Sequence, residues 1–197
     1  MNVKLAQIRR VADVEVLTSV PARRAFALVS FVLLTAFSAH VSMPLPGTAV
    51  PVSLQTLMVL LSGMLLGPAL GASAQVAYLL AGAAGLPVFA AGIGFPALFG
   101  PTGGYLLAFP AAAAIAGAAS VRPRGSAMAQ AGALTVAGLL ALVAIFAGGW
   151  AQLTLLTGDA ATALRLGVLP FLLGDLVKLV IAVVIALRIR SRTLALL

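Results

Sequence analysis

The sequence predicts an all-α integral membrane protein, a bundle of six transmembrane helices with both chain termini in the cytoplasm. Hydrophobic residues make up 62% of the 197 residues, and the mean hydropathy of +1.19 lies far above that of soluble domains. Long apolar runs recur along the chain, separated by short stretches rich in proline and glycine. Basic residues gather at the ends of these runs, which is typical of membrane topology signals.

Six apolar segments are long enough to cross a bilayer, which takes about 20 residues in a helix. They cover residues 24–41, 52–68, 69–85, 102–120, 126–149 and 169–189. Gly67-Pro68 separates the second segment from the third, and we expect a tight hairpin there because proline interrupts a continuous helix. Residues 1–22 are too polar to span and are expected to form a cytoplasmic tail, so residues 23–197 form a single membrane domain.

Three connections between the segments differ in composition. Residues 42–51 contain three prolines and are predicted to be a loop. Residues 86–101 also carry glycine and proline but stay apolar, so we expect this loop to pack over another part of the protein. Residues 150–168 are expected to form a short connection. All three lie at the end of the predicted bundle opposite the two termini.

The basic residues predict the orientation of the bundle, because cytoplasmic loops carry an excess of lysine and arginine. Ten bases fall on one side of the predicted membrane, whereas only Arg165 falls on the other. The ten are Lys4, Arg9, Arg10, Arg23, Arg24, Arg122, Arg124, Arg188, Arg190 and Arg192. This asymmetry places both termini in the cytoplasm and accounts for the net charge of +8 without a nucleic-acid partner.

Asp175 and Lys178 place an acid and a base inside the last apolar segment. A charge in the bilayer is destabilising by about 3 kcal/mol on insertion scales, so it is normally paired and faces the protein interior. The two residues are roughly one helical turn apart on one helix face, and Asp175 lies about 10 Å into the segment from the outer side. Three interpretations stay open: a structural ion pair, a pair that binds a ligand, or a proton relay.

Other polar side chains in the apolar segments also need partners, because lipid offers no hydrogen bonds. They are Gln55, Gln75, Tyr78, Thr102, Tyr105 and Gln130. For any one of these residues, a hydrogen bond between helices is the expected role. Gln55 and Tyr105 fall near the predicted depth of Asp175 and are therefore also candidate site residues.

Several kinds of chemistry are excluded by residues that the sequence lacks. The run Gly100-Pro101-Thr102-Gly103-Gly104-Tyr105 has no lysine of a nucleotide-binding loop, so its glycines are expected to let the backbone approach a neighbour or a ligand. The chain has no cysteine, a single histidine (His40) and four acids, too few ligands for a metal site. We therefore expect no enzyme, no metal and no cofactor.

Three groups of motifs, distributed along the six apolar segments, resemble the BioY family, the biotin-specific S component of energy-coupling factor (ECF) transporters. The motifs are VPVSLQTL at 50–57 with GMLLGP at 63–68, GLPVF at 85–89 with GPTGGY at 100–105, and GDLVK at 174–178. The resemblance covers about residues 24–190. It implies a membrane protein that captures biotin from outside the cell with high affinity.

The resemblance also implies a binding site and partners. Asp175 and Lys178 would contact biotin, while Gln55 and the Gly103-Gly104-Tyr105 segment would help to enclose it. In the family, a membrane-embedded T component and two cytoplasmic ATPases complete the transporter, here expected in the inner (cytoplasmic) membrane of a bacterial cell. A second hypothesis is a solitary secondary transporter or facilitator of biotin or another small vitamin, with or without proton coupling through Asp175. The oligomeric state is left open, including a homo-oligomer.

Overall fold

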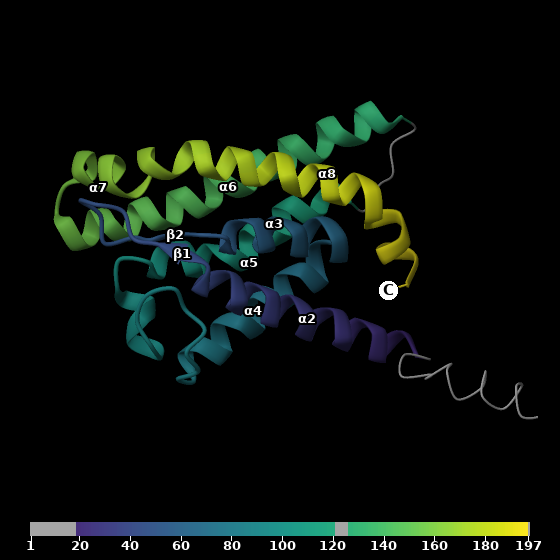
Figure 1. The fold of residues 1–197 in the computed structure, drawn as a ribbon, viewed down its shortest axis with the longest axis horizontal. Coiled ribbons are helices and arrows are strands. Elements are labelled where there is room, and N and C mark those ends of the chain that lie inside the picture. The colour runs from purple at the N-terminus through teal and green to yellow at the C-terminus, as the bar shows by residue number, and fades with distance from the viewer. Residues whose placement is uncertain (1–18, 121–125, 197) are drawn as a thin grey trace, which may run out of the picture.

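The structure, a computed structural model, describes residues 19–120 and 126–196 as an elongated, mostly helical bundle (Figure 1). Its long helices are α2 (Val20–His40), α3 (Gln55–Leu66), α4 (Pro68–Ala83), α5 (Gly103–Ala118), α6 (Ala127–Thr157) and α8 (Leu172–Leu196). Shorter elements are the strands β1 (Ser42–Met43) and β2 (Val52–Ser53), the 3-10 helices η1 (Phe95–Phe99) and η2 (Leu169–Phe171), and the helix α7 (Ala160–Gly167).

The two ends of the bundle differ in what they contain. The strand pair, η1 and α7 gather at one end, here called the loop end, which lies at the left of Figure 1. The start of α2 and the end of α8 lie together at the other end, here called the terminal end. The chain therefore runs back and forth along the long axis, as the sequence predicts.

A helix lies in each of the six predicted segments, but their lengths are unequal. Three stretches of the described chain are long and apolar enough to cross a membrane, namely residues 20–40, 127–157 and 160–189. By contrast α3 has 12 residues and extends for only about 18 Å. Apart from the half-buried Met58, all residues of α3 are buried, which suits its apolar composition on every side.

The first long helix starts earlier than predicted. It begins at Val20 rather than at residue 24, because the Ser19 hydroxyl accepts a hydrogen bond from the Ala22 amide and Pro21 occupies the first turn. Residues 20–22 of the predicted tail therefore lie in the helix, as do Arg23 and Arg24. The rest of the predicted tail, residues 1–18, lies outside the described residues.

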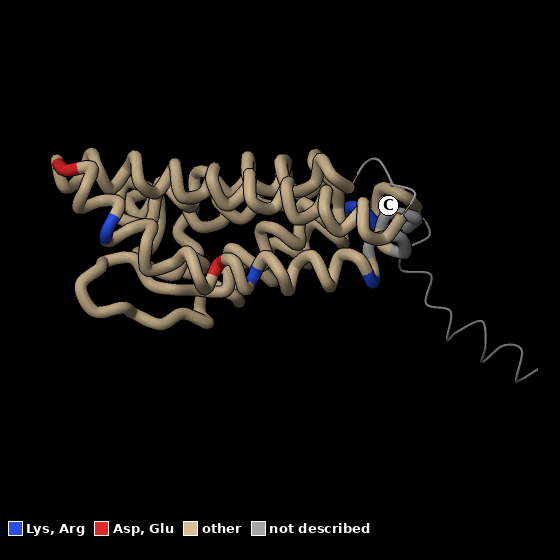
Figure 2. The backbone as a smooth tube through the Cα atoms, turned by 90° about the horizontal axis from the view of Figure 1, so that it is seen from above, with Lys and Arg blue, Asp and Glu red and all other residues tan. Residues whose placement is uncertain are grey.

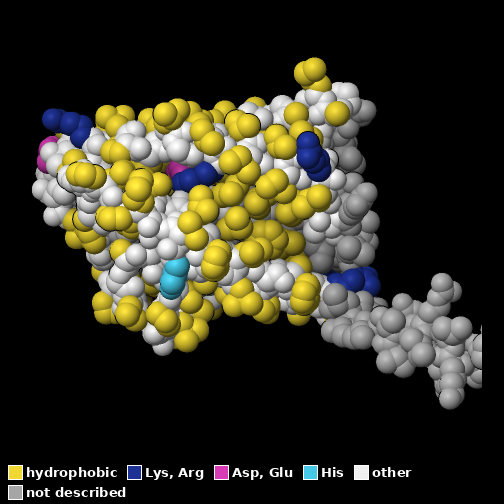
Figure 3. All heavy atoms as spheres, viewed as in Figure 1, with side chains coloured by type: hydrophobic (Ala, Val, Ile, Leu, Met, Phe, Trp, Pro, Cys, Tyr) yellow, Lys and Arg dark blue, Asp and Glu magenta, His cyan; other side chains and the backbone are white. Residues whose placement is uncertain are grey.

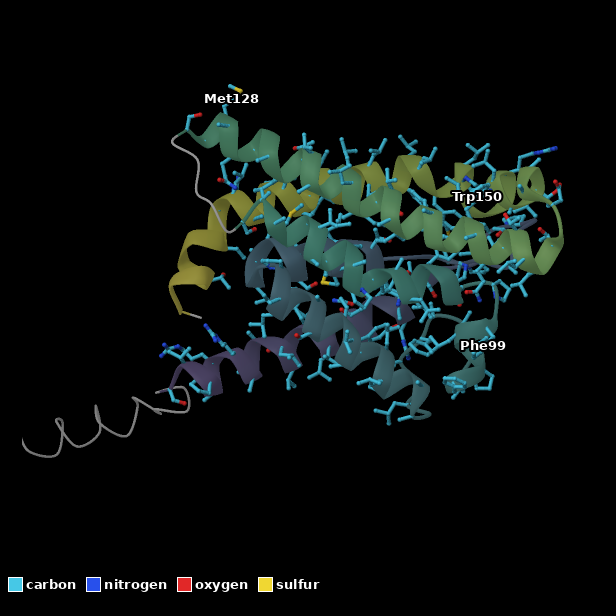
Figure 4. All side chains as sticks on the ribbon, turned by 180° about the vertical axis from the view of Figure 1, so that it is seen from behind. Phe99, Met128 and Trp150 are labelled. Carbon is cyan, nitrogen blue, oxygen red and sulfur yellow. The ribbon has the colours of Figure 1, made fainter. Side chains whose placement is uncertain are left out.

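The predicted short connection at residues 150–168 is wrong, because α6 continues to Thr157 and α7 follows after two residues. The pair Gly148-Gly149 lies inside α6, where both glycines pack against α5. Trp150 links the two helices, since its indole nitrogen donates to the Ala160 carbonyl over 3.0 Å, and Figure 4 shows it on α6 close to α7. The labelled Met128 and Phe99 instead point away from the bundle, with 85% and 65% of their surface exposed.

Close packing toward the terminal end depends on small residues. A Cβ atom on Gly63 of α3 would collide with the Ala113 carbonyl oxygen of α5, and one on Gly117 would collide with the turn between α3 and α4. That turn consists of Gly67 alone, with a φ of 84°, as expected for the tight hairpin. Helices α3, α4 and α5 consequently touch through their backbones.

The two long connections at the loop end are ordered. Residues 42–51 form the predicted loop, and their flanks pair as a short antiparallel ladder that joins Ser42 to Ser53 and Met43 to Val52. The apolar connection 86–101 packs against the bundle as expected, because Phe89 and Leu98 are buried. Both connections contribute residues to the site described below.

Charged residues mark the two ends of the bundle. Figure 2 shows charged positions at both ends of the long axis. Between the ends, an acidic position (red) and a basic position (blue) lie next to each other. Arg23 and Arg24 in the first turns of α2 belong to the terminal end, whereas Arg165 lies on α7 at the loop end. Arg122 and Arg124 lie outside the described residues, as do the side chains of Arg190 and Arg192.

Candidate ligand-binding site

A cavity lies between α3, α5, α6 and α8 toward the loop end. With its open mouth counted, the empty space amounts to about 500 Å³. Its wall combines aromatic and aliphatic side chains with a few polar ones. The lining residues are Val50, Pro51, Ser53, Gln55, Thr56, Ala90, Thr102, Tyr105, Leu106, Phe109, Ile145, Phe146, Phe171, Asp175 and Lys178.

Asp175 and Lys178 form an ion pair inside this cavity. Lys178 Nζ donates to Asp175 Oδ1 over 2.6 Å, and the two side chains are only 10% and 6% exposed, respectively. Asp175 lies in the first turn of α8, where the helix dipole favours a negative charge. Figure 3 shows acidic and basic atoms side by side in the middle of a mostly apolar face. The pair is thus buried yet borders a space that a ligand can fill.

Thr56 is a neighbour of the ion pair that the sequence analysis did not select. Its hydroxyl lies 3.5 Å from Asp175 Oδ2, so it supports the carboxylate oxygen that Lys178 leaves free. Thr56 follows Gln55 directly at the start of α3, and both residues line the cavity. Its place next to a predicted site residue was the signal in the sequence that could have found it.

Gln55 belongs to a chain of hydrogen bonds that leaves the cavity. The Ser53 hydroxyl donates to Gln55 Oε1 over 3.1 Å, and Gln55 Nε2 donates to the Tyr78 hydroxyl over 2.7 Å. Tyr78 in turn donates to the Val88 carbonyl over 2.9 Å. The Gln55 side chain is therefore held by two other polar groups while it borders the cavity.

Tyr105 contributes its ring to the cavity wall, whereas its hydroxyl is engaged elsewhere. The hydroxyl donates to the Gly167 carbonyl at the end of α7 over 2.6 Å. The ring lies against Gly149 of α6, where a Cβ atom would collide with it. Tyr105 thus joins α5 to the segment that precedes Phe171 and the ion pair of α8.

Gly103 and Gly104 do not line the cavity. A Cβ atom on Gly104 would collide with the Gly148 carbonyl of α6, and one on Gly103 would collide with the Leu98 carbonyl of η1. These glycines therefore serve close approach to a neighbouring segment, one of the two roles expected from the sequence. Gln152 of α6 completes this contact, since its Nε2 donates to the carbonyl oxygens of Leu98 and Gly100 over 3.1 and 2.6 Å.

Four of the six predicted site residues are thus brought together: Gln55, Tyr105, Asp175 and Lys178. Aromatic side chains that the sequence analysis did not select add much of the wall, namely Phe109, Phe146 and Phe171. No sequence signal distinguished these rings, because an apolar residue in an apolar segment is equally suited to the core or to lipid.

The remaining polar candidates mostly join helices, as expected. Gln75 of α4 donates to Thr35 of α2 over 3.3 Å and to Ser62 of α3 over 3.1 Å. Gln130 of α6 donates to the Ala119 carbonyl over 3.1 Å. His40 is exposed at the end of α2.

The cavity has the chemistry of a binding site for a small, partly apolar molecule with polar ends. Lys178 offers positive charge and hydrogen-bond donors, and Asp175 offers acceptors. Gln55 and Thr56 add groups that both donate and accept, while the aromatic rings cover apolar parts of a ligand. A few convergent polar groups in an otherwise apolar pocket are typical of such sites.

Comparison with known proteins identifies the family. The BioY family model matches residues 9–195. The chain is 40% identical to the "Probable biotin transporter BioY" of Pyrococcus horikoshii over 164 residues, which cover 83% of this chain and 93% of that protein. It is 38% identical to the "Biotin transporter BioY" of Thermotoga maritima over 162 residues, which cover 82% of this chain and 92% of that protein.

A solved structure agrees with the sequence relatives. The crystal structure of the S-component for biotin from an ECF-type ABC transporter matches this fold with a TM-score of 0.70 and 25% sequence identity. The match covers 85% of this chain and 92% of the solved chain. The family model, the two relatives and the shared fold all lead to the same conclusion, that this chain belongs to the BioY family.

Proposed function

We propose that this chain binds biotin with high affinity and takes it up across the membrane as the S component of an ECF transporter. The observation that carries the proposal is the Asp175–Lys178 ion pair, buried in the wall of a cavity whose lining is otherwise mostly apolar. A buried pair that only fastened a helix would gain little over apolar packing. Beside a cavity, the same two charged side chains can bind a ligand.

Biotin matches the groups that surround the cavity. Its ureido group offers N–H donors and a carbonyl acceptor, and its tail ends in a carboxylate. Lys178 can donate to either acceptor of biotin, and Asp175 can accept from the ureido N–H groups. The aromatic wall formed by Phe109, Phe146 and Phe171 suits the apolar body between these ends.

We further propose that six segments cross the membrane with both termini in the cytoplasm. The arginines at the start of α2 support this orientation, as does the gathering of the loops at the opposite end. The chain has no cysteine, so single cysteines can be introduced and labelled with a membrane-impermeant maleimide on intact cells. Cysteine at Thr48 or Ala160 should react from outside, whereas cysteine at Ser126 or Arg188 should react only after lysis. The reverse pattern would overturn the orientation.

The proposed partners are a T component and two ATPases in the cytoplasmic membrane of a bacterial cell, because the matched structure is an S-component of an ECF-type ABC transporter. Uptake should therefore persist under a protonophore while cellular ATP is maintained, and should stop when ATP is depleted. Loss of uptake under the protonophore alone would instead favour proton coupling through Asp175.

Equilibrium binding to the purified chain in detergent tests the ligand. Biotin should bind tightly and desthiobiotin, which keeps the ureido group, more weakly or equally, whereas thiamine and riboflavin should not bind. Binding of another vitamin in place of biotin would show that the proposed specificity is wrong. Absence of binding by all four would contradict the S-component function.

A matched pair of variants tests the role of the acid. Asp175→Asn should weaken biotin binding about tenfold or more, because a charged hydrogen bond is lost. Asp159→Asn is the control, since Asp159 is an exposed acid at the start of α7 and does not line the cavity. Normal affinity in Asp175→Asn would remove Asp175 from the site.

Biotin amide, in which the carboxylate is neutral, distinguishes the two orientations of the ligand. If Lys178 meets the carboxylate, Lys178→Ala should abolish the preference for biotin over biotin amide. If Lys178 meets the ureido carbonyl, the preference should persist while both affinities fall.

A further inference from the structure

We propose that Tyr78, which does not line the cavity, is a positioning residue that fixes which way the Gln55 amide faces. The inference rests on the proposed biotin binding. Gln55 can present its oxygen and nitrogen in two orientations that have nearly the same shape. The orientation is selected by whether the neighbouring hydroxyl groups of Tyr78 and Ser53 can donate or accept toward Gln55. Each of these hydroxyl groups is itself hydrogen-bonded to a backbone group.

The Val88 carbonyl fixes one end of the hydrogen-bond chain. A carbonyl oxygen can only accept, so the proton of the Tyr78 hydroxyl points to Val88 over 2.9 Å. The Tyr78 oxygen is then left as an acceptor toward Gln55, at 2.7 Å. Gln55 must therefore turn its NH₂ group, and not its oxygen, toward Tyr78.

Ser53 fixes the other end in the same sense. The backbone amide of Gln55 can only donate, and it lies 3.4 Å from the Ser53 hydroxyl oxygen. The hydroxyl proton of Ser53 is thereby free to donate to Gln55 Oε1, which lies 3.1 Å away. Both neighbours thus favour one orientation, which leaves a defined donor and a defined acceptor of Gln55 for a ligand.

Burial makes this arrangement rigid. Tyr78 is 0% exposed and Gln55 is 5% exposed, so water has little access to the hydrogen bond between them. The Tyr78 ring packs edge-on against Phe89, with centroids 5.6 Å apart, and parallel to Phe109, with centroids 6.5 Å apart. Phe109 lines the cavity, so the Tyr78 ring also supports the cavity wall from outside.

Tyr78→Phe removes the hydroxyl and keeps these ring contacts. Without the hydroxyl the Gln55 amide loses the partner that selects its orientation, and biotin binding should weaken about five- to tenfold, the size of one hydrogen bond. The decisive measurement is a double-mutant cycle with Gln55→Ala. If Tyr78 acts through Gln55, then Tyr78→Phe should change the affinity of Gln55→Ala by less than about twofold.

Tyr105→Phe is the matched control. It deletes the same phenol hydroxyl, which also donates to a backbone carbonyl, but Tyr105 has no hydrogen bond to Gln55. Its effect on biotin affinity should be the same with and without Gln55→Ala. Ser53→Ala tests the other end of the hydrogen-bond chain. Like that of Tyr78→Phe, its effect on biotin affinity should vanish in Gln55→Ala.

The outcomes separate this inference from the proposed function. Equal effects of Tyr78→Phe in both backgrounds would overturn the positioning role and leave biotin binding intact. Failure of the wild-type chain to bind biotin would overturn the proposed function and this inference with it. If Tyr78→Phe does not fold, persistence of the Ser53→Ala effect in Gln55→Ala would overturn the fixed orientation.

Discussion

The two ends of α3 show how one short helix serves both packing and binding. At Gly63 the backbone of α3 touches the backbone of α5, with no room for a side chain. At Gln55 and Thr56, about two turns earlier, α3 instead borders the cavity, whose wall consists of polar and aromatic side chains among aliphatic ones. The bundle is therefore closed at one end of α3 and open at the other.

This difference indicates how a small membrane protein can hold a polar site without losing stability. Backbone contacts such as Gly63 with Ala113 fix the helix axes toward the terminal end. Side chains at the loop end can then be selected for ligand contacts. Substitutions at the closed end should change stability, and those at the open end should change binding.

Lys178→Ala should give the largest effect, because it should lower both stability and biotin binding. It leaves Asp175 as an unpaired buried acid, which should destabilise the protein by about 3 kcal/mol, and it should abolish tight biotin binding. Thermal unfolding in detergent without biotin and equilibrium binding measure the two effects.

The double variant Asp175→Asn/Lys178→Met separates stability from binding. Replacing both charges should restore most of the stability, because no buried charge is left without a partner. Biotin binding should stay lost. Restored stability together with normal biotin binding would show that the ion pair only fastens α8 in the bundle.

Gly63→Ala tests the closed end alone. The added methyl group would collide with the Ala113 carbonyl, so α3 and α5 must move apart, at about 2 kcal/mol of unfolding free energy. Gly132→Ala is the control, because nothing lies within 4 Å of its added Cβ atom, and it should be stabilising by about 0.5–1 kcal/mol. Biotin affinity should change little in either variant. An unchanged stability of Gly63→Ala would contradict the close packing of α3 on α5.

The helices could be predicted largely because composition and the proline and glycine positions encode them. The prediction was wrong at residues 150–168, because α6 continues past Gly148-Gly149 to Thr157. A glycine pair looks the same in sequence whether it ends a helix or packs against another one. Only the position of Tyr105 and Gly104 on α5 explains why glycine is needed there.

The site was predicted in part for a similar reason. Asp175, Lys178 and Gln55 are polar groups in apolar segments, so they stand out in the sequence. Phe109 and the other rings of the wall do not, because their role depends on which helix face meets the cavity. Gly103 lies next to a lining residue yet faces α6 and η1, a distinction that only the rotation of α5 decides.

Gln152→Leu tests how the loop end supports the cavity. It removes the hydrogen bonds to Leu98 and Gly100, so the segment that leads to Thr102 in the cavity wall should loosen. We expect a loss of about 1 kcal/mol in unfolding free energy and a biotin affinity reduced about threefold. Gln130→Leu, which removes a hydrogen bond to Ala119 at the terminal end, is the matched control. It should lower stability similarly and leave binding unchanged; equal effects on binding would contradict the division between the ends.

Asp159→Asn should give the smallest effect, a slight change in stability at the loop end. Hydrogen bonds from the Thr162 hydroxyl first, and then from the backbone amides of Thr162 and Ala161, hold the pKa of this exposed carboxyl at the start of α7 below its ordinary value. A carboxyl with a lowered pKa in the folded state stabilises the protein above its unfolded pKa of about 3.9, and this contribution is lost as the pH falls through the lower, folded value.

The measurement is the pH dependence of thermal unfolding for wild type beside Asp159→Asn, which keeps a capping acceptor but has no charge to titrate. The wild type should be slightly the more stable at neutral pH, because its charge favours the start of α7. The difference should begin to shrink as the pH falls below about 4, where the carboxyl of the unfolded chain becomes protonated, and should vanish below the lower pKa of the folded state. A difference that stays constant down to the lowest pH would show that the charge of Asp159 contributes nothing, and that the cap acts through its hydrogen bonds alone.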